Sequence, residues 1–156
     1  KTKEAAADLS RQVQTKLADK FYYAVTDGTP EKKKDTLEDY LLRDGKTNTS
    51  KVVGKSTEGA KLARLNYEVL EQNKTNAILR IQLDTGRHHQ IRVQMAHAGM
   101  ALVGDKKYNY NKEENGQEPL ALCSAKLGFR HPVTKKKMEF QVVPTGSAFR
   151  IFHTGL

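Results

Sequence analysis

Two stretches of alternating apolar residues constrain the fold of this chain more than any other feature. Apolar residues recur at every second position of each stretch: Ala63, Leu65, Tyr67 and Val69 in the first, and Leu79, Ile81 and Leu83 in the second. A two-residue period indicates a half-buried β-strand, and the short polar sequence EQNKTN between the stretches fits a hairpin connection. The sequence therefore predicts an antiparallel pair of strands.

The flanking sequence predicts further strands and two helices. We expect strands at residues 21–27, 119–129 and 137–143, and helices at residues 3–18 and 88–98, the second ended by Gly99. Turns or loops are indicated at residues 29–35, 44–51, 100–109 and 111–118. Residues 36–43 fit either a short helix or an irregular strand. This order predicts an α+β fold, a mainly antiparallel mixed sheet with flanking helices.

The length and charge of the chain narrow its class. At 156 residues it fits one domain or one lobe of a larger one. Its formal charge of +9 favours polyanionic partners, nucleic acid before anionic membranes. A basic protein with no such partner is the alternative. Because Cys123 is the one cysteine, no internal disulfide can form, which favours a cytoplasmic protein. No apolar run approaches the roughly 18 residues of a membrane span, so we expect no membrane partner.

Residues 84–99, DTGRHHQIRVQMAHAG, combine arginines, histidines and glutamines with core-like residues, and we call them the signature segment. Its histidines lack the H-E-x-x-H spacing of a zinc site, so we expect no metal. The chain also has no G-x-S-x-G elbow, P-loop or G-x-G-x-x-G motif, and therefore no anchor for a nucleotide cofactor.

Arg92 is the residue of this segment that most needs a partner. On a helix, Ile91, Met95 and Ala98 form one apolar stripe and Arg92 lies at its flank. An unpaired charge beside a core costs several kcal/mol, so Arg92 requires a carboxylate, a phosphate or carbonyl groups. The plainer alternative is that its side chain reaches water or meets a structural carboxylate. The residues alone leave both alternatives open.

Three stretches, in order, resemble the RluA family of RNA pseudouridine synthases. TGRHHQIRVQMAHAGMALVGDKKY (85–108) matches the family pattern T-G-R-x-H-Q-I-R…G…G-D-x-x-Y. DKFYYAV with Gly28 resembles its K-x-Y-x-A…G strand, and LCSAKLGFRHPVTKKKMEF resembles its final L-x-F-x-H-P-V-T segment. The resemblance covers nearly the whole chain, with Gln94 and Cys123 standing where many members have histidine. It implies a pseudouridine-synthase-like catalytic domain that lacks its N-terminal portion.

The resemblance also implies a reaction and its residues. The family isomerises uridine in RNA by cutting the N1–C1′ bond and rejoining the base through C5, with an aspartate nucleophile and no cofactor. Whether that aspartate attacks the sugar or the base stays open. Catalytic roles map to Tyr22 and Arg92, and RNA-binding roles to Arg87, His89, Gln90 and Lys20. We expect Arg92 to hold the charge of the nucleophile and Tyr22 to contact the flipped uracil.

Several of these residues have plainer roles beside the implied ones. His89 and Gln90 fit equally well as groups that bond to the backbone of the signature segment. Tyr23, on the opposite face of its strand from Tyr22, is expected in the core. Asp105 is expected to fix a loop without taking part in the chemistry.

The family's nucleophile motif, H-R-L-D-x-x-T-S-G, is not in this sequence. The resemblance places it roughly 15 residues before Lys1, so residues 1–156 are expected to be the C-terminal portion of the catalytic domain and inactive alone. The alternative is a non-catalytic RNA-binding module of the same fold. The sequence does not indicate whether the RNA is ribosomal or transfer RNA, whether an S4-type domain precedes this portion, or which oligomer forms.

Overall fold

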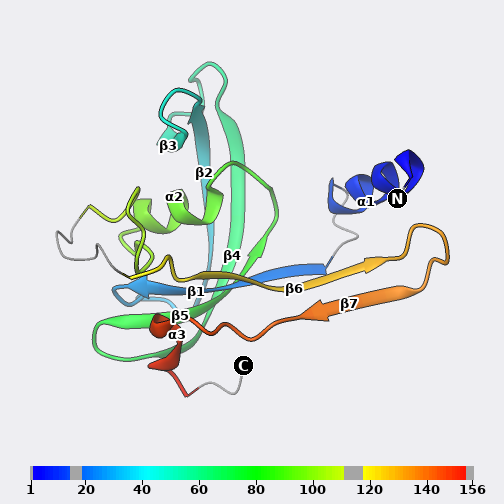
Figure 1. The fold of residues 1–156 in the computed structure, drawn as a ribbon. Coiled ribbons are helices and arrows are strands. Elements are labelled where there is room, and N and C mark those ends of the chain that lie inside the picture. Colours follow the sequence, from blue (N-terminus) through cyan, green and yellow to red (C-terminus); the bar gives the residue numbers. More distant parts are fainter. Residues whose placement is uncertain (1, 15–18, 111–117, 154–156) are drawn as a thin grey trace.

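The structure is a computed structural model that describes residues 2–14, 19–110 and 118–153. Its body is an antiparallel sheet with strand order β3-β2-β4-β5-β1-β6-β7 (Figure 1). The strands are β1 Asp19–Asp27, β2 Lys34–Asp44, β3 Thr49–Val53, β4 Lys61–Gln72, β5 Asn76–Leu83, β6 Leu122–Arg130 and β7 Lys137–Gln141. The helices are α1 Lys3–Gln14, α2 Gln90–His97 and α3 Ser147–Arg150. The predicted α+β class and antiparallel sheet are confirmed.

Each face of the central strands carries its own apolar cluster. On one face, α2 packs against β1, β4 and β5 through residues that include Ile91, Met95, Leu65 and Ile81, all at most 4% exposed. On the other face, α3 and the residue Phe152 cover part of β1, β5 and β6. Because side chains alternate across a strand, β1 serves both clusters. The face that α2 covers is called the α2 face below.

The hairpin of β4 and β5 matches the alternating pattern in the sequence. Leu65 pairs with Leu83, and Tyr67 pairs with Ile81. The α2 helix ends as predicted at Gly99, whose φ of 77° suits glycine. There the backbone N–H of Met100 donates to the carbonyl of Met95 at 2.9 Å, which closes the helix in a Schellman motif.

Several predicted boundaries differ from the structure. Residues 36–43 lie within strand β2, whose ladders with β3 and β4 decide between the two options left open by the sequence. Strand β3 lies partly in a stretch expected to be a turn, and α3 was not expected. Of the loop expected at 29–35, residues 34 and 35 belong to β2. The predicted second helix began too early, since residues 88 and 89 precede α2. Residues 15–18 of the predicted first helix and 111–117 of a predicted loop lie outside the described residues.

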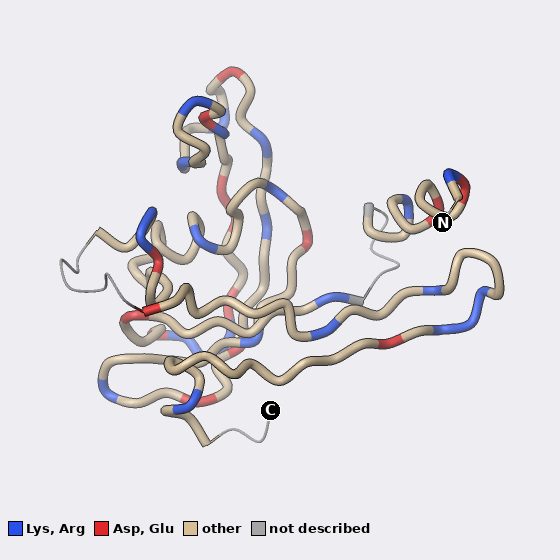
Figure 2. Tube along the Cα trace, viewed as in Figure 1, with Lys and Arg blue, Asp and Glu red and all other residues tan. Residues whose placement is uncertain are grey.

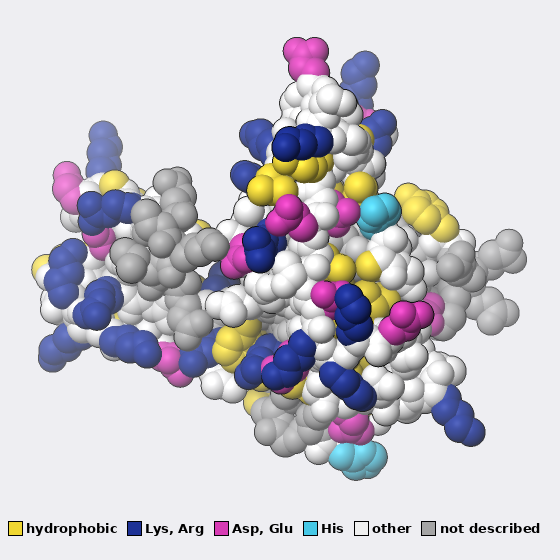
Figure 3. Space-filling view, turned by 180° about the vertical axis from the view of Figure 1, so that it is seen from behind, with side chains coloured by type: hydrophobic (Ala, Val, Ile, Leu, Met, Phe, Trp, Pro, Cys, Tyr) yellow, Lys and Arg dark blue, Asp and Glu magenta, His cyan; other side chains and the backbone are white. Residues whose placement is uncertain are grey.

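Positive charge is distributed along the whole described chain, as Figure 2 shows. Seen from behind, Lys and Arg side chains gather most densely over the lobe formed by α1 and the β6–β7 turn (Figure 3). Among the described residues, no helix has the length and apolar character that crossing a membrane requires.

The buried turn at Gly104 gives a test of this packing. Gly104 has a φ of 72°, and a Cβ there would lie 2.3 Å from the carbonyl oxygen of Pro119. We expect Gly104→Ala to lower the free energy of unfolding by at least about 2 kcal/mol, because the backbone conformation and the overlap both oppose a side chain. Urea denaturation measures this, with Gly86→Ala as the matched control, since a Cβ at Gly86 meets nothing within 4 Å. Equal stability of the two variants would contradict the described packing.

Candidate active site

The signature segment forms a tight turn followed by α2, and Gln90 holds the turn in place. His89 precedes the helix with a φ of 52°, which is unusual for a residue other than glycine. The Gln90 side chain accepts hydrogen bonds from the Thr85 hydroxyl at 2.8 Å and from the Arg87 backbone N–H at 2.9 Å. It donates to the Arg64 carbonyl at 3.1 Å. At 2% exposure, Gln90 braces the turn and presents no surface for direct contact with RNA.

Arg92, on the first turn of α2, forms a bidentate ion pair with Asp105. Its Nε donates to Oδ2 at 2.8 Å and its Nη2 donates to Oδ1 at 2.6 Å. The backbone N–H groups of Lys107 and Tyr108 also donate to Oδ1, at 2.9 and 3.1 Å. Burial raises the pKa of Asp105, but the hydrogen bonds from Arg92 and Lys107 outweigh it and hold this pKa below its ordinary value. Asp105 is therefore ionised at neutral pH and fixes the guanidinium in one orientation.

His89 lies against a different edge of the same guanidinium. Its Nε2 is 3.3 Å from Nη1 of Arg92, and its Nδ1 is 2.9 Å from the Tyr108 hydroxyl. Burial, followed by the charge of Arg92, lowers the pKa of His89 to about 4. The ring is thus neutral at pH 7. Because Arg92 donates to Nε2, the proton of the neutral ring belongs on Nδ1.

A further layer of hydrogen bonds joins these groups to β3. The Tyr108 hydroxyl accepts from the Ser50 backbone N–H at 2.9 Å, and the Tyr108 ring centre lies 5.0 Å from the guanidinium carbon of Arg92. The Ser50 hydroxyl is 2.9 Å from Nδ1 of His88, whose ring lies 3.8 Å from that of His89. The β2–β3 hairpin therefore restrains the two imidazoles and the tyrosine that surround Arg92.

Tyr22 and Lys20 lie on β1 and share the α2 face. Tyr22 is partly buried against the cluster that contains Ile91 of α2, and Nζ of Lys20 lies 5.1 Å from the centre of its ring. Tyr23 belongs to the cluster on the opposite face and is 6% exposed. The expected division between the two tyrosines is confirmed: Tyr23 is a core residue, and Tyr22 belongs to the face that carries Arg92.

Arg87 lies at the exposed rim of this site. Its Nε donates to the Leu62 carbonyl at 2.9 Å, which anchors one edge of the guanidinium to the start of β4. The side chain is otherwise exposed. Arg87 is thus oriented but accessible, as a residue that contacts phosphate needs to be.

Arg92 has a partner within the chain that the sequence interpretation did not assign to it. We expected a carboxylate upstream of Lys1 and gave Asp105 only the role of fixing a loop. In the structure Asp105 binds both Arg92 and the loop backbone, as in the alternative of a structural carboxylate, while the contact with an upstream carboxylate stays a prediction. Both residues belong to the same family pattern, which was the available signal, but their separation in sequence hid the contact.

The buried face of α2 is wider than the predicted stripe. Ala98 is exposed, whereas Gln94 is fully buried. Nε2 of Gln94 donates to Oδ2 of Asp39 at 2.8 Å and to the Ala63 carbonyl at 3.3 Å. At the position where many family members have histidine, this glutamine therefore fastens α2 to β2 and β4.

The histidines of the signature segment bond to protein groups. Nδ1 of His97 is 3.1 Å from Oδ1 of Asp39, while His88 and His89 bond to Ser50 and Tyr108. Within residues 2–14, 19–110 and 118–153, no three His, Cys, Asp or Glu side chains are grouped so that they could hold a metal ion.

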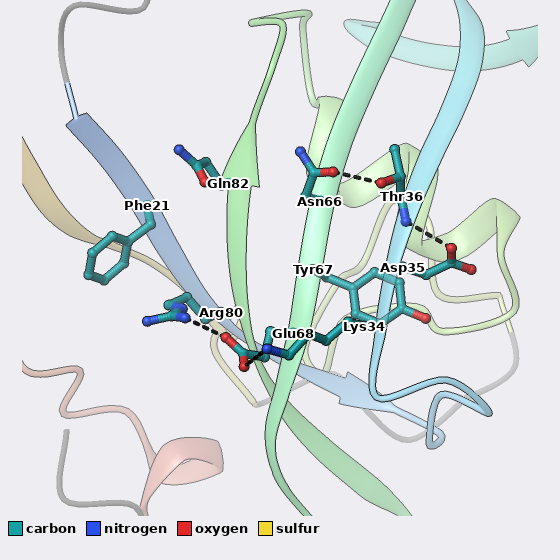
Figure 4. A pocket seen from close by; sticks show the side chains of 9 residues that line it. All are labelled: Phe21, Lys34, Asp35, Thr36, Asn66, Tyr67, Glu68, Arg80 and Gln82. Atoms are coloured by element: carbon teal, nitrogen blue, oxygen red, sulfur yellow. Dashed lines mark hydrogen bonds and ion pairs between the residues drawn. The ribbon is translucent and has the colours of Figure 1, made fainter.

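A groove of about 600 Å³ lies on the opposite face of the sheet and contains none of the predicted site residues (Figure 4). Glu68 at its base pairs with Lys34 at 2.7 Å and with Arg80. The Thr36 hydroxyl donates to Asn66 at 2.6 Å. Since these polar groups compensate one another, we place the candidate site on the α2 face.

Comparisons with known proteins agree on one family. A family model described as RNA pseudouridylate synthase matches residues 1–97. An uncharacterised RNA pseudouridine synthase of Bacillus subtilis is 37% identical over 139 residues, which cover 88% of this chain and 44% of the relative. A ribosomal large subunit pseudouridine synthase D of Haemophilus influenzae is 32% identical and covers 90% of this chain and 46% of its own length. The chain thus spans about half the length of these curated relatives.

A solved structure shares the fold. The human RNA pseudouridylate synthase domain containing 1 superposes with a TM-score of 0.78 at 22% identity, covering 92% of this chain and 61% of that chain.

The ion pair of Arg92 predicts a large loss of stability in Asp105→Asn. We expect the free energy of unfolding to fall by about 3 kcal/mol at pH 7, because a partly buried guanidinium loses its fully buried counter-ion. Since the folded-state pKa of Asp105 is lowered, its contribution is present above pH 4 and is lost as the pH falls below that value. The difference from wild type should therefore narrow in acid. Asp35→Asn, which breaks an exposed pair with Lys32, is the control and should change stability little; a similar loss in both variants would contradict the special role of Asp105.

The lowered pKa of His89 can be measured directly. In a ¹H–¹³C NMR titration we expect the His89 ring, assigned with His89→Gln, to protonate with a midpoint near pH 4. The unfolded chain binds this proton near pH 6.5, so the wild type should lose stability as the pH falls from about 6.5 to 4. A midpoint near 6.5 would show that the ring is neither buried nor beside Arg92.

Proposed function

The chain belongs to the RNA pseudouridylate synthase family, within its RluA group, and on that premise we propose that it isomerises uridine in RNA to pseudouridine. The observation that carries the proposal is the orientation of Arg92 by Asp105 on the face of the sheet that also carries Tyr22. The isomerisation conserves every atom: the N1–C1′ bond breaks, a C5–C1′ bond forms, C5 loses a proton and N1 gains one. It transfers no electrons to another molecule, so we propose that it needs no cofactor.

Arg92 would hold the nucleophilic carboxylate in its ionised form. A guanidinium has five N–H donors; two bind Asp105 and one lies against His89. Two donors remain for a second carboxylate, which this cation would keep charged. We propose that this carboxylate is an aspartate upstream of Lys1 and that Asp105 keeps the remaining donors aimed at it.

Tyr22 would contact the uracil ring, and Lys20 the RNA backbone beside it. A phenol ring that is surrounded by apolar side chains can stack on a flipped uracil. Its hydroxyl can then lie near C5 of the uracil, from which the proton must leave. Lys20 lies over the same ring and would pair with a nearby phosphate. Arg87 would provide a second phosphate contact at the rim, with His89 and Gln90 bracing the segment that presents it.

The relatives suggest which RNA to test first. Because several are named for the ribosomal large subunit, ribosomal RNA is the first candidate and transfer RNA the second. Since the chain covers about half of these relatives, we propose that it is the C-terminal portion of a catalytic domain, inactive without the portion that carries the aspartate. We further propose a cytoplasmic location.

Two pairs of variants in the full-length protein test the proposed chemistry. We expect Arg92→Ala to lower the rate of pseudouridine formation by about 100-fold or more, because the nucleophile loses its counter-ion, while Arg87→Ala mainly weakens RNA binding. Tyr22→Phe should lower the rate by about 100-fold, whereas Tyr23→Phe, on the opposite face, should leave it near wild type. Mass spectrometry of nucleosides from modified RNA measures the product.

Two outcomes would contradict the proposal. Near-normal turnover in Arg92→Ala would remove this residue from the active site. A full-length wild-type protein that binds RNA but forms no pseudouridine from any ribosomal or transfer RNA would instead indicate a non-catalytic RNA-binding module.

A further inference from the structure

The far end of the β6–β7 hairpin projects beyond the rest of the sheet. The outermost residue pair between β1 and β6 joins Asp19 to Gly128, so residues 129–138 continue past the start of β1 as a two-stranded ribbon (Figure 1). A two-stranded ribbon alone is only marginally stable in water. This one therefore requires support from another part of the chain.

Helix α1 supplies that support through Gln12. Its Nε2 donates to the carbonyl of Arg130 at 2.8 Å, and the backbone N–H of Arg130 donates to its Oε1 at 2.8 Å. The amide thus satisfies two strand groups that lie beyond the last pair with β1. Gln12 is 5% exposed and also donates to Asp8 at 2.7 Å, and Asp8 pairs with Lys135 of the turn at 3.6 Å. These contacts hold the ribbon at its strand and at its turn.

The supported ribbon carries a concentrated positive charge. Across α1 and residues 126–139 there are seven cations and three carboxylates: Lys3, Arg11, Lys126, Arg130, Lys135, Lys136 and Lys137 against Glu4, Asp8 and Glu139. Residues 119–138 contain no Asp or Glu. Arg130 and Lys137 are direct cross-strand partners, and like charges in this arrangement destabilise a hairpin. Glu139 lies 3.8 Å from Lys137 and offsets part of this repulsion; a polyanion that binds both side chains would remove the rest.

We propose that the end of this ribbon, residues 130–137, binds the phosphate backbone of the RNA whose uridine lies at Tyr22. This inference rests on the proposed function. Tyr22 pairs with Ser124 of β6, and Arg130 lies six residues farther along the same strand. At about 3.3 Å per residue the separation is about 20 Å. One strand of double-stranded DNA carries a phosphate about every 3.4 Å. With a comparable spacing along RNA, the ribbon reaches phosphates about six nucleotides from the reacting uridine.

Two runs of three lysines provide a matched test. Lys135→Gln/Lys136→Gln/Lys137→Gln removes three of the four Lys and Arg charges of residues 130–137. Lys32→Gln/Lys33→Gln/Lys34→Gln removes the same charge from an exposed run before and at the start of β2, which follows the opposite end of β1. The probes are a fluorescent RNA hairpin, with a loop uridine and a stem of about ten base pairs, and a uridine trinucleotide too short to span 20 Å. Fluorescence anisotropy over a series of salt concentrations gives the affinities for the full-length protein.

We expect the ribbon variant to bind the RNA hairpin at least about tenfold more weakly near 0.1 M salt. The slope of the logarithm of its affinity against the logarithm of the salt concentration should be smaller by about two, because fewer counterions are released. The control variant should change hairpin affinity by less than about threefold, and the ribbon variant should bind the trinucleotide as the wild type does. The single reversal Lys136→Glu, at an exposed position, should weaken hairpin binding more than Lys136→Gln. Thermal unfolding checks that each variant is folded.

Three results would overturn the inference. Equal weakening by both triple variants would attribute the effect to net charge alone. Unchanged hairpin binding by the ribbon variant would remove the ribbon from the RNA interface and leave the proposed function intact, provided that the wild type binds and modifies RNA. A wild-type protein that binds neither probe would overturn the inference and the RNA partner of the proposed function together.

Discussion

The ion pair between Arg92 and Asp105 is the interaction on which the candidate site depends. Asp105 is almost completely buried and accepts two hydrogen bonds from the guanidinium and two from backbone N–H groups. It therefore joins α2 to the loop that follows it and fixes which edge of Arg92 is occupied. The loop reaches this position because residue 104 is a glycine: a Cβ at Gly104 would overlap the carbonyl group of Pro119. A partly buried cation with donors that no described residue occupies is costly, and Asp105, His89 and Tyr108 surround and stabilise this one.

The two faces of the sheet have different physical characters. On the α2 face, burial keeps His89 neutral beside a guanidinium, and Tyr22 packs against the apolar cluster beneath α2. On the opposite face, Glu68 is shared by Lys34 and Arg80, so the charges there are satisfied and exposed to solvent. Among the described residues, the α2 face therefore combines partly buried surroundings with an oriented guanidinium, which is why we propose the active site there.

The sequence predicted those elements whose formation depends on residues close together in the chain. The alternation in β4 and β5 and the glycine that ends α2 needed no distant partner, and the family pattern placed Arg92 and Tyr22 on the expected elements. Contacts between distant segments were not predictable. Gln12 bonds to a backbone 118 residues away, and strand β2 forms its ladders with β3 on one side and with β4 on the other. A helical wheel cannot show that Gln94 is buried and Ala98 exposed, because the position of β2 decides it.

The most direct test is a structure of the full-length protein bound to a uridine-containing RNA. We predict that Asp105 retains Nε and Nη2 of Arg92 while a second carboxylate, from the segment before Lys1, occupies the remaining donors at about 2.8 Å. We also predict that the target uracil lies against the ring of Tyr22. If the uridine instead lies on the opposite face of the sheet, or Arg92 contacts no carboxylate besides Asp105, the assignment of the active site is wrong.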